Sequence, residues 1–152
     1  MRYSENKLSA EDDLQDGFVL IYKNLKQFDS TKGTFKSWAA RIMINVCLAK
    51  IRKQKIYFLD IDDASITTKV KNQREIANSN LNLQELSNLI QTLPTGQKTV
   101  FNLYAIDGFS HKEIAEKLRI STSTSKTQLM KAKNMLQIKI NNQQKISNKF
   151  CG

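Results

Sequence analysis

The sequence between Phe109 and Leu129 constrains the fold of this chain more than any other stretch. Ser110 and, three residues later, Glu113 form the pattern of a capping box, which begins a short helix. Ser121 can cap a second helix after a turn of three residues. Apolar side chains then recur at helical spacing in both helices: Ile114, Ala115, Leu118, Leu129, Ala132 and Leu136. Two short helices joined by a tight turn, the second one basic, predict a helix-turn-helix, whose second helix enters the major groove of DNA.

The composition favours an all-α fold around this motif. The 152 residues include only five glycines and one proline, which is too little turn-forming material for an all-β fold. Leucine, isoleucine, lysine and the amides recur at helical spacing along most of the chain. We therefore expect two small helical domains joined by a linker, the second being a helix-turn-helix domain of winged-helix-like type without a wing.

Two long helices are predicted ahead of the motif. Residues 3–28 carry an apolar stripe that comprises Ala10, Leu14, Phe18, Ile21, Tyr22 and Leu25. A cluster of acidic and amide side chains between Glu11 and Asp16 lies on the opposite side. Residues 34–54 place Phe35, Trp38, Ala39, Ile42, Val46 and Ala49 on one face. A neighbouring stripe on that helix comprises Arg41, Asn45, Leu48 and Arg52. A helix with an apolar face and a polar flank suits docking on a nucleic-acid strand.

The rest of the chain is divided by breaks in this patterning. Residues 57–80 are weakly patterned and are predicted to be the linker. A helix from Leu83 ends at Pro94 because proline cannot continue it, and a further helix precedes the turn at Asp107-Gly108. The last helix is expected to end near Ile140. Residues 143–152 are polar and are predicted to be a flexible tail.

Charge is distributed unevenly along the chain. Residues 30–55 contain seven basic and no acidic residues, and residues 108–152 contain nine basic and two acidic ones. The segments 1–29 and 56–107 each contain four basic and six acidic residues. Two basic blocks separated by an acidic one indicate two contacts with an anionic partner such as DNA. The alternative is that the lysines simply form solvated faces.

Nothing in the sequence suggests catalysis. His111 is the only histidine, lies on the expected exposed side of a capping turn and has no evident nucleophile beside it. Cys47 and Cys151 match no metal-ligand spacing, and Cys47 is predicted to be a small buried residue. No signal peptide or membrane-spanning run is present. We expect a cytoplasmic protein that is not an enzyme, with no metal, cofactor, small-molecule substrate or membrane insertion.

The exposed face of the second helix of the motif is the predicted DNA-reading surface. With Leu129 directed inward, Ser125, Ala132 and Leu136 also point inward. The outward side chains can donate to guanine or phosphate, or contact a thymine methyl group: Ser123, Lys126, Thr127, Met130 and Lys131. The alternative is that these are ordinary exposed helix residues.

Three segments together resemble a sigma-70-family transcription initiation factor of the extracytoplasmic-function (ECF) group. The first is Ala10-Glu11-Asp12 followed by Gln15-Asp16 and Phe18. The second runs from Phe28-Asp29 through Gly33-Thr34-Phe35-Lys36-Ser37-Trp38, Arg41-Ile42 and Asn45 to Ile51-Arg52-Lys53. The third comprises Leu93-Pro94, Gln97, Val100-Phe101, Gly108-Phe109-Ser110 and Glu113-Ile114-Ala115. The third set is shared by many DNA-binding regulators, whereas the first two in this order are more specific.

The resemblance implies a role for each part of the chain. Residues 1–56 would be a region 2-like domain, whose Asp12, Gln15 and Asp16 bind core RNA polymerase. Its Arg41, Asn45, Arg52 and Lys53 would hold the separated −10 promoter element. Residues 81–142 would be a region 4-like domain that reads the −35 element with its helix-turn-helix. Core RNA polymerase and promoter DNA are the implied partners, and an anti-sigma factor is a further candidate.

The sequence departs from the family pattern at three places. The family has a further helix ahead of Ala10, and this chain begins too close to that segment to contain it, so the start is misplaced or the protein is a truncated paralogue. Arg119 replaces a small residue in the turn. Ser125 replaces an apolar residue at an inward position, where a hydroxyl packs less well unless it is hydrogen-bonded. The alternatives to an active sigma factor are therefore a helix-turn-helix regulator that works without polymerase, and an inactive truncated sigma paralogue.

Overall fold

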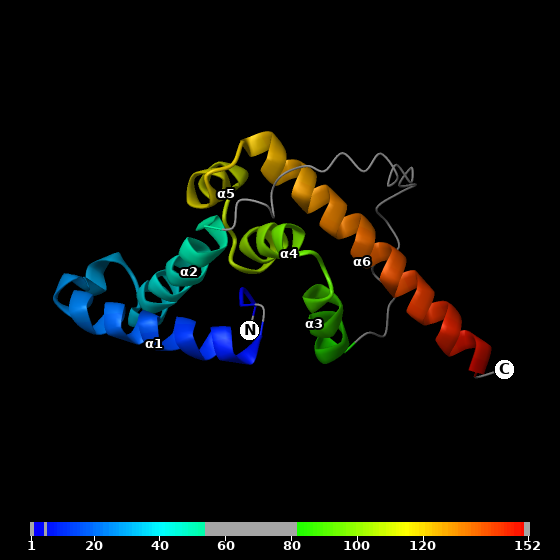
Figure 1. Ribbon diagram of the computed structural model, residues 1–152, viewed down its shortest axis with the longest axis horizontal. Coiled ribbons are helices and arrows are strands. Elements are labelled where there is room, and N and C mark those ends of the chain that lie inside the picture. The colour runs from blue at the N-terminus through cyan, green and yellow to red at the C-terminus, as the bar shows by residue number, and fades with distance from the viewer. Residues whose placement is uncertain (1, 5, 54–81, 151–152) are drawn as a thin grey trace.

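The computed structural model describes residues 2–4, 6–53 and 82–150, with side chains as far as residue 142. Within these ranges every regular element is helical and no strand occurs, which confirms the predicted all-α fold (Figure 1). The N-terminal elements are α1 (Lys7–Asn24), η1 (Leu25–Gln27), η2 (Ser30–Lys32) and α2 (Phe35–Lys53). The C-terminal elements are α3 (Leu83–Gln91), α4 (Thr95–Phe101), η5 (Asn102–Ile106), α5 (His111–Leu118) and α6 (Thr122–Phe150). The predicted linker, residues 57–80, lies outside the described residues.

Local capping sets where the first two helices begin. Asn6 accepts a hydrogen bond from the Ser9 amide at 2.8 Å, so α1 begins at Lys7 rather than at the predicted residue 3. Thr34 Oγ1 accepts from the Ser37 amide at 3.2 Å and begins α2 where the sequence predicts it. The two helices approach closely at Gly17, where a Cβ atom would lie 2.1 Å from Met43 Sδ.

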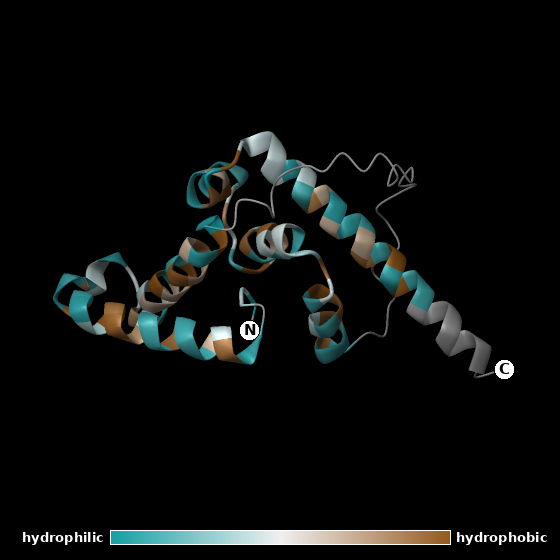
Figure 2. Cartoon of the chain, viewed as in Figure 1, coloured by the Kyte–Doolittle hydropathy of each residue, from teal (hydrophilic) through white to brown (hydrophobic). Residues whose placement is uncertain are grey.

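The buried side of α1 differs from the predicted stripe. Ile21 is buried, but Phe18 and Tyr22 are 59% and 81% exposed, and hydrophobic residues are visible along α1 in Figure 2. The reason is tertiary, because α2 covers the side of α1 that carries Asp13, Gly17 and Ile21. Apart from Ile21, most of the predicted stripe lies beside that contact and is left uncovered.

The C-terminal helices follow the predicted breaks, with one exception. Asn82 and Glu85 form a capping box at the start of α3, and Pro94 separates α3 from α4. The π-helical turn η5 follows α4 directly. The predicted end of α6 near Ile140 is wrong, because the helix continues to Phe150. Neither glycine nor proline occurs between residues 141 and 150 to stop it.

The described residues form two hydrophobic clusters, and one of them crosses the expected domain boundary. The larger cluster joins Tyr3 and two residues of α2, Leu48 and Ile51, to the C-terminal helices. Its C-terminal members are Val100, Leu103, Ile114, Leu118 and Leu129. The second cluster packs α3 against α6 through Leu89, Ile90, Leu93, Ala132, Leu136 and Ile140. The sequence pattern predicts two separate domains and gives no sign of this shared core.

Candidate nucleic-acid and polymerase interfaces

The turn of the helix-turn-helix is built from local hydrogen bonds. Ser110 Oγ accepts from the Glu113 amide at 3.3 Å, and Glu113 Oε2 accepts from the Ser110 amide at 2.8 Å, which confirms the capping box. The hydrogen bond from the Ser110 backbone holds the pKa of Glu113 below its usual value. Arg119 ends α5 in the left-handed conformation (φ 56°, ψ 46°). Ser121 Oγ then accepts from the Thr124 amide at 2.9 Å and caps α6 as predicted.

Ser125 is fully buried, and its hydroxyl has a partner that the sequence did not reveal. His111 Nδ1 lies 2.9 Å from Ser125 Oγ, and the His111 ring stacks on Tyr104 with centroids 4.7 Å apart. Burial, together with the charges of Lys126 and Lys133, lowers the pKa of His111. The histidine is therefore half-buried rather than exposed, and an apolar residue at position 125 would leave its ring nitrogen unpaired.

The start of α6 presents the predicted DNA-reading residues on its outer side. Ser123, Lys126 and Met130 are exposed, and Thr127 and Lys131 are half-buried. The inward positions Ser125, Ala132 and Leu136 are buried, as the helical spacing predicts. The second helix of the motif therefore combines a buried face with a polar and cationic outer face, the arrangement needed to enter a major groove.

The predicted −10 residues follow one flank of α2, and this flank lies against α5. Arg52 Nη1 donates to the carbonyl oxygen of Lys117 at 2.8 Å, and Lys117 Nζ donates to Asn45 Oδ1 at 3.1 Å. Arg41 lines a cleft between α2 and the helix-turn-helix domain, whereas Lys53 is exposed. The other residues of this cleft are Ser37, Ala40, Ile44, Asp107, Gly108, Phe109 and Glu113. No pattern in the sequence pointed to Lys117, because its role depends on how the two halves pack.

Trp38 packs within an aromatic cluster at the start of α2. Its ring centroid lies 5.5 Å from that of Phe28 and 5.7 Å from that of Phe35. The side chain is half-buried, in keeping with its predicted place on the apolar face of this helix.

The predicted polymerase-binding residues of α1 are exposed, and an acidic neighbour turns inward. Asp12, Gln15 and Asp16 all lie on the surface. Asp13 is buried, accepts from Ser4 Oγ at 2.7 Å and pairs with Lys50 Nζ at 2.7 Å. Burial raises the pKa of Asp13, but the bonds from Lys50 and Ser4 outweigh it and hold the pKa below its usual value. Lys50 is about half exposed and also pairs with the surface residue Asp16 at 3.4 Å, so one lysine contacts both the buried and an exposed carboxylate of the acidic cluster.

Other kinds of site are not formed by the described residues. In the part of the chain that the structure describes, no three histidine, cysteine, aspartate or glutamate side chains gather as metal ligands. None of the described helices has the length and hydrophobicity needed to cross a membrane.

Taken together, these features define a helix-turn-helix protein of the DNA-binding transcription class, in which α1 and α2 form a second helical unit and α2 packs against the helix-turn-helix domain. The family model described as "Sigma-70 region 2" matches residues 1–56, and that described as "Sigma-70, region 4" matches residues 83–136. The chain belongs to the sigma-70 family of RNA polymerase sigma factors, in the ECF group.

Individual relatives agree with this assignment. The chain is 34% identical to the ECF RNA polymerase sigma factor SigW of Bacillus subtilis, over 86% of this chain and 75% of SigW. It is 26% identical to the RNA polymerase sigma factor NccH of Alcaligenes xylosoxydans xylosoxydans, over 82% of this chain and 69% of NccH. Its fold is similar to that of the sigma factor RpoE of Bartonella quintana, solved in complex with the anti-sigma factor NepR. That likeness has a TM-score of 0.54 at 21% identity and covers 93% of this chain and 86% of the other.

Proposed function

We propose that this protein binds core RNA polymerase and directs it to particular promoters, without enzymatic activity of its own and in the cytoplasm. The observation that carries the proposal is the presence of both family regions, in order, on one chain. A regulator that works without polymerase would need the helix-turn-helix but not the 56 residues that match region 2.

Each surface then has a separate task. Asp12, Gln15 and Asp16 on α1 bind the polymerase. Arg41, Asn45, Arg52 and Lys53 on α2 hold the separated −10 strand, where captured bases favour the open duplex. The outer face of α6 reads the −35 element through Ser123, Lys126, Thr127, Met130 and Lys131. An anti-sigma factor is a further candidate partner, since a sigma factor of similar fold has been solved in complex with one.

Co-elution of the purified full chain with core RNA polymerase tests the proposal. Wild type should co-elute at low salt, and the double variant Asp12→Arg/Gln15→Ala should bind about tenfold more weakly or worse, because a repulsive charge enters a charged interface. Glu116→Arg, a charge reversal at an exposed carboxylate of α5, is the matched control and should bind as wild type does. A wild-type protein that never associates with polymerase would favour a polymerase-independent regulator or an inactive paralogue.

A further inference from the structure

We propose that the uncovered apolar face of α1 is a self-association surface, on which a second copy of this chain docks with its own α1 running in the opposite direction. Such a dimer also covers Asp12 and Gln15, so it keeps polymerase away from α1. The pairing of the two copies is argued from the apolar and charged side chains of α1 alone. Only its competition with polymerase rests on the proposed function.

The segment formed by α1 and η1 carries more than half of the large hydrophobic side chains that are exposed. Among the described residues thirteen such side chains are exposed, and seven of them lie between Leu8 and Leu25. Leu14, Phe18, Tyr22 and Leu25 follow one another at steps of four and three, so they share one face, which we call the α1 apolar face. Contiguous exposed hydrophobic surface of this kind marks sites of protein–protein contact.

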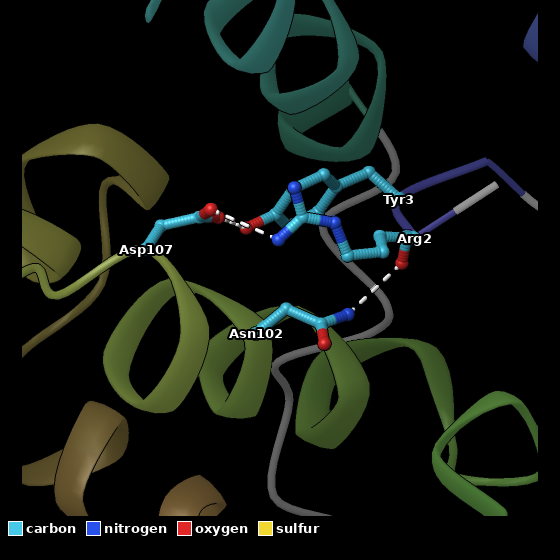
Figure 3. Close-up of polar contacts among 4 residues, drawn as sticks. All are labelled: Arg2, Tyr3, Asn102 and Asp107. Carbon is cyan, nitrogen blue, oxygen red and sulfur yellow. Dashed lines mark hydrogen bonds and ion pairs between the residues drawn. The ribbon is translucent and has the colours of Figure 1, made fainter. Parts of the chain in front are cut away.

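The described parts of the chain next to α1 leave this face open. α2 packs against the buried side of α1. The segment that precedes α1 is bound to the helix-turn-helix domain instead (Figure 3). There Asn102 Nδ2 donates to the carbonyl oxygen of Arg2 at 3.0 Å, and Arg2 Nη1 pairs with Asp107 Oδ1 at 3.0 Å. The Tyr3 hydroxyl donates to the other oxygen of Asp107, so this segment does not extend along the α1 apolar face.

The charges of this segment fit a second copy that runs antiparallel. The exposed charged side chains of the N-terminal half of α1 are one lysine and three carboxylates: Lys7, Glu11, Asp12 and Asp16. From Phe18 to the end of η1 the charged residues are Lys23 and Lys26, both exposed, with no acidic residue. An antiparallel pair therefore places the acidic half of each copy beside the basic end of the other. A parallel pair would bring like charges together, which opposes association.

The spacing of the apolar residues also indicates how the two helices align. A pair of identical helices related by a twofold axis makes each contact twice. With Phe18 beside its own counterpart at the axis, Leu14 comes level with Tyr22 of the second copy, and large side chains meet along the whole contact. In the same alignment Asp12 comes level with Lys23 of the second copy. The apolar and the charged contacts are thus satisfied together.

The dimer and the polymerase need the same side chains. Asp12 and Gln15, two members of the proposed polymerase-binding set, lie on the row of α1 that borders the α1 apolar face. A second helix on that face covers them. Only the monomer is then available to polymerase, and the available fraction falls as the concentration of the protein rises.

Sedimentation velocity of the full chain between about 5 and 500 µM measures the association. Wild type should approach twice the monomer mass only toward the upper end, because one pair of helices buries less than a standard interface and gives a weak dimer. Phe18→Glu brings two carboxylates together at the axis and should weaken the dimer by about tenfold or more. Ile138→Glu, at an exposed isoleucine of α6, is the matched control and should dimerise as wild type does. A wild type that stays monomeric, or that forms only larger aggregates, would overturn the proposal.

Charge reversal tests the pairing of acidic and basic halves. Glu11→Lys/Asp12→Lys makes the segment basic throughout its exposed face, and Lys23→Glu/Lys26→Glu makes it acidic, so each variant alone should self-associate about fivefold more weakly than wild type. Mixed in equal amounts, the two variants should form a heterodimer at least as stable as the wild-type dimer, because opposite charges then meet at both ends. A mixture that associates no better than its components would contradict the charge pairing.

Disulfide trapping tests the direction of the helices. Cys47 and Cys151 are first replaced by alanine, and either Phe18→Cys or Leu8→Cys is then introduced. Oxidation with copper phenanthroline should link the Phe18→Cys protein into a dimer, because the axis places position 18 beside itself. Leu8→Cys is the control: the site is 70% exposed, yet the antiparallel arrangement separates its two copies by about 30 Å. Equal linking at both positions would overturn the antiparallel arrangement.

The linked dimer also separates the competition from the proposed function. The oxidised Phe18→Cys dimer should fail to co-elute with core RNA polymerase, and reduction with dithiothreitol should restore co-elution. A linked dimer that still binds polymerase would overturn the competition. Failure of the dilute wild-type monomer to bind polymerase would instead count against the proposed function, while the sedimentation and trapping results would continue to decide whether the dimer forms.

Discussion

Arg119 carries backbone strain at the centre of the DNA-reading motif. Among the described residues it is the one non-glycine residue with a positive φ, 56°. The Cβ atom of an L-residue in this region crowds the neighbouring carbonyl oxygen. Arg119 departs from the family pattern, which has a small residue in this turn, and the positive φ gives the physical reason for that preference.

Arg119→Gly should therefore stabilise the protein by about 0.5–1 kcal/mol, the relief of strain being partly offset by the greater entropy of glycine in the unfolded chain. Urea denaturation followed by circular dichroism measures the change. Arg119→Ala is the control: it removes the same side chain but keeps the Cβ atom, so it should give no such gain. A destabilised glycine variant would mean that the arginine side chain, and not the backbone, governs this position.

His111 should make stability depend on pH. Its pKa is lowered from 6.5 in the folded protein by burial and by Lys126 and Lys133, so the unfolded chain takes up the proton first. The stability that the folded protein gains from keeping His111 neutral is therefore complete above pH 6.5, and it is lost as the pH falls below that value. The free energy of unfolding of wild type should fall between about pH 7 and pH 5 relative to that of His111→Asn, which does not titrate there. If the free energies of unfolding of the two proteins changed with pH in the same way, the lowered pKa of His111 would be contradicted.

Among the helices, α6 allows the most direct experimental test of DNA recognition. Lys126 is exposed on its outer face. Lys126→Ala should weaken binding to duplex promoter DNA and reduce the slope of log K against log salt by about one, as expected for one lost phosphate contact. Lys26→Ala, at an exposed lysine in η1, removes the same charge away from this helix and should leave the slope nearly unchanged. Anisotropy titrations at several salt concentrations distinguish the two.

Comparison of the predicted helices with the observed ones shows which features depend on local sequence alone. The capping box at Ser110, the cap at Ser121 and the break at Pro94 were predicted correctly, because each depends on residues within one turn. The predicted end of α6 was wrong, since a polar composition does not stop a helix that lacks glycine or proline. The buried side of α1 was also mispredicted, because its partner helix and not its own spacing decides which side is covered.

The whole molecule is held together by a core that the sequence did not predict. The spacing placed Leu48 in a polar stripe between Asn45 and Arg52, yet Leu48 has no exposed surface. Its environment is supplied by residues about fifty or more positions away, such as Val100 and Leu118. No local pattern encodes such a contact. The −10 candidates could therefore be named from the sequence, but their engagement by Lys117 could not.

Leu48→Ala should lower the free energy of unfolding by about 2–5 kcal/mol, the usual cost of removing a fully buried leucine side chain. Leu8→Ala removes the same atoms from a side chain that is 70% exposed and should cost far less. Because Leu48 belongs to a core shared by both halves, wild type should unfold in one transition by circular dichroism and by Trp38 fluorescence. Separate transitions from the two probes would show that the halves unfold independently.

The shared core also bears on how this protein can be dissected in the laboratory. A cut within residues 57–80 would divide the chain between its two family regions. One fragment would then present Tyr3, Leu48 and Ile51 to water, and the other would present Val100, Leu103 and Leu118. Fragments with such newly uncovered hydrophobic surfaces tend to self-associate. Low solubility of either half would thus reflect the loss of its natural covering, and inactivity of a half would say little about the DNA contacts made by the intact chain.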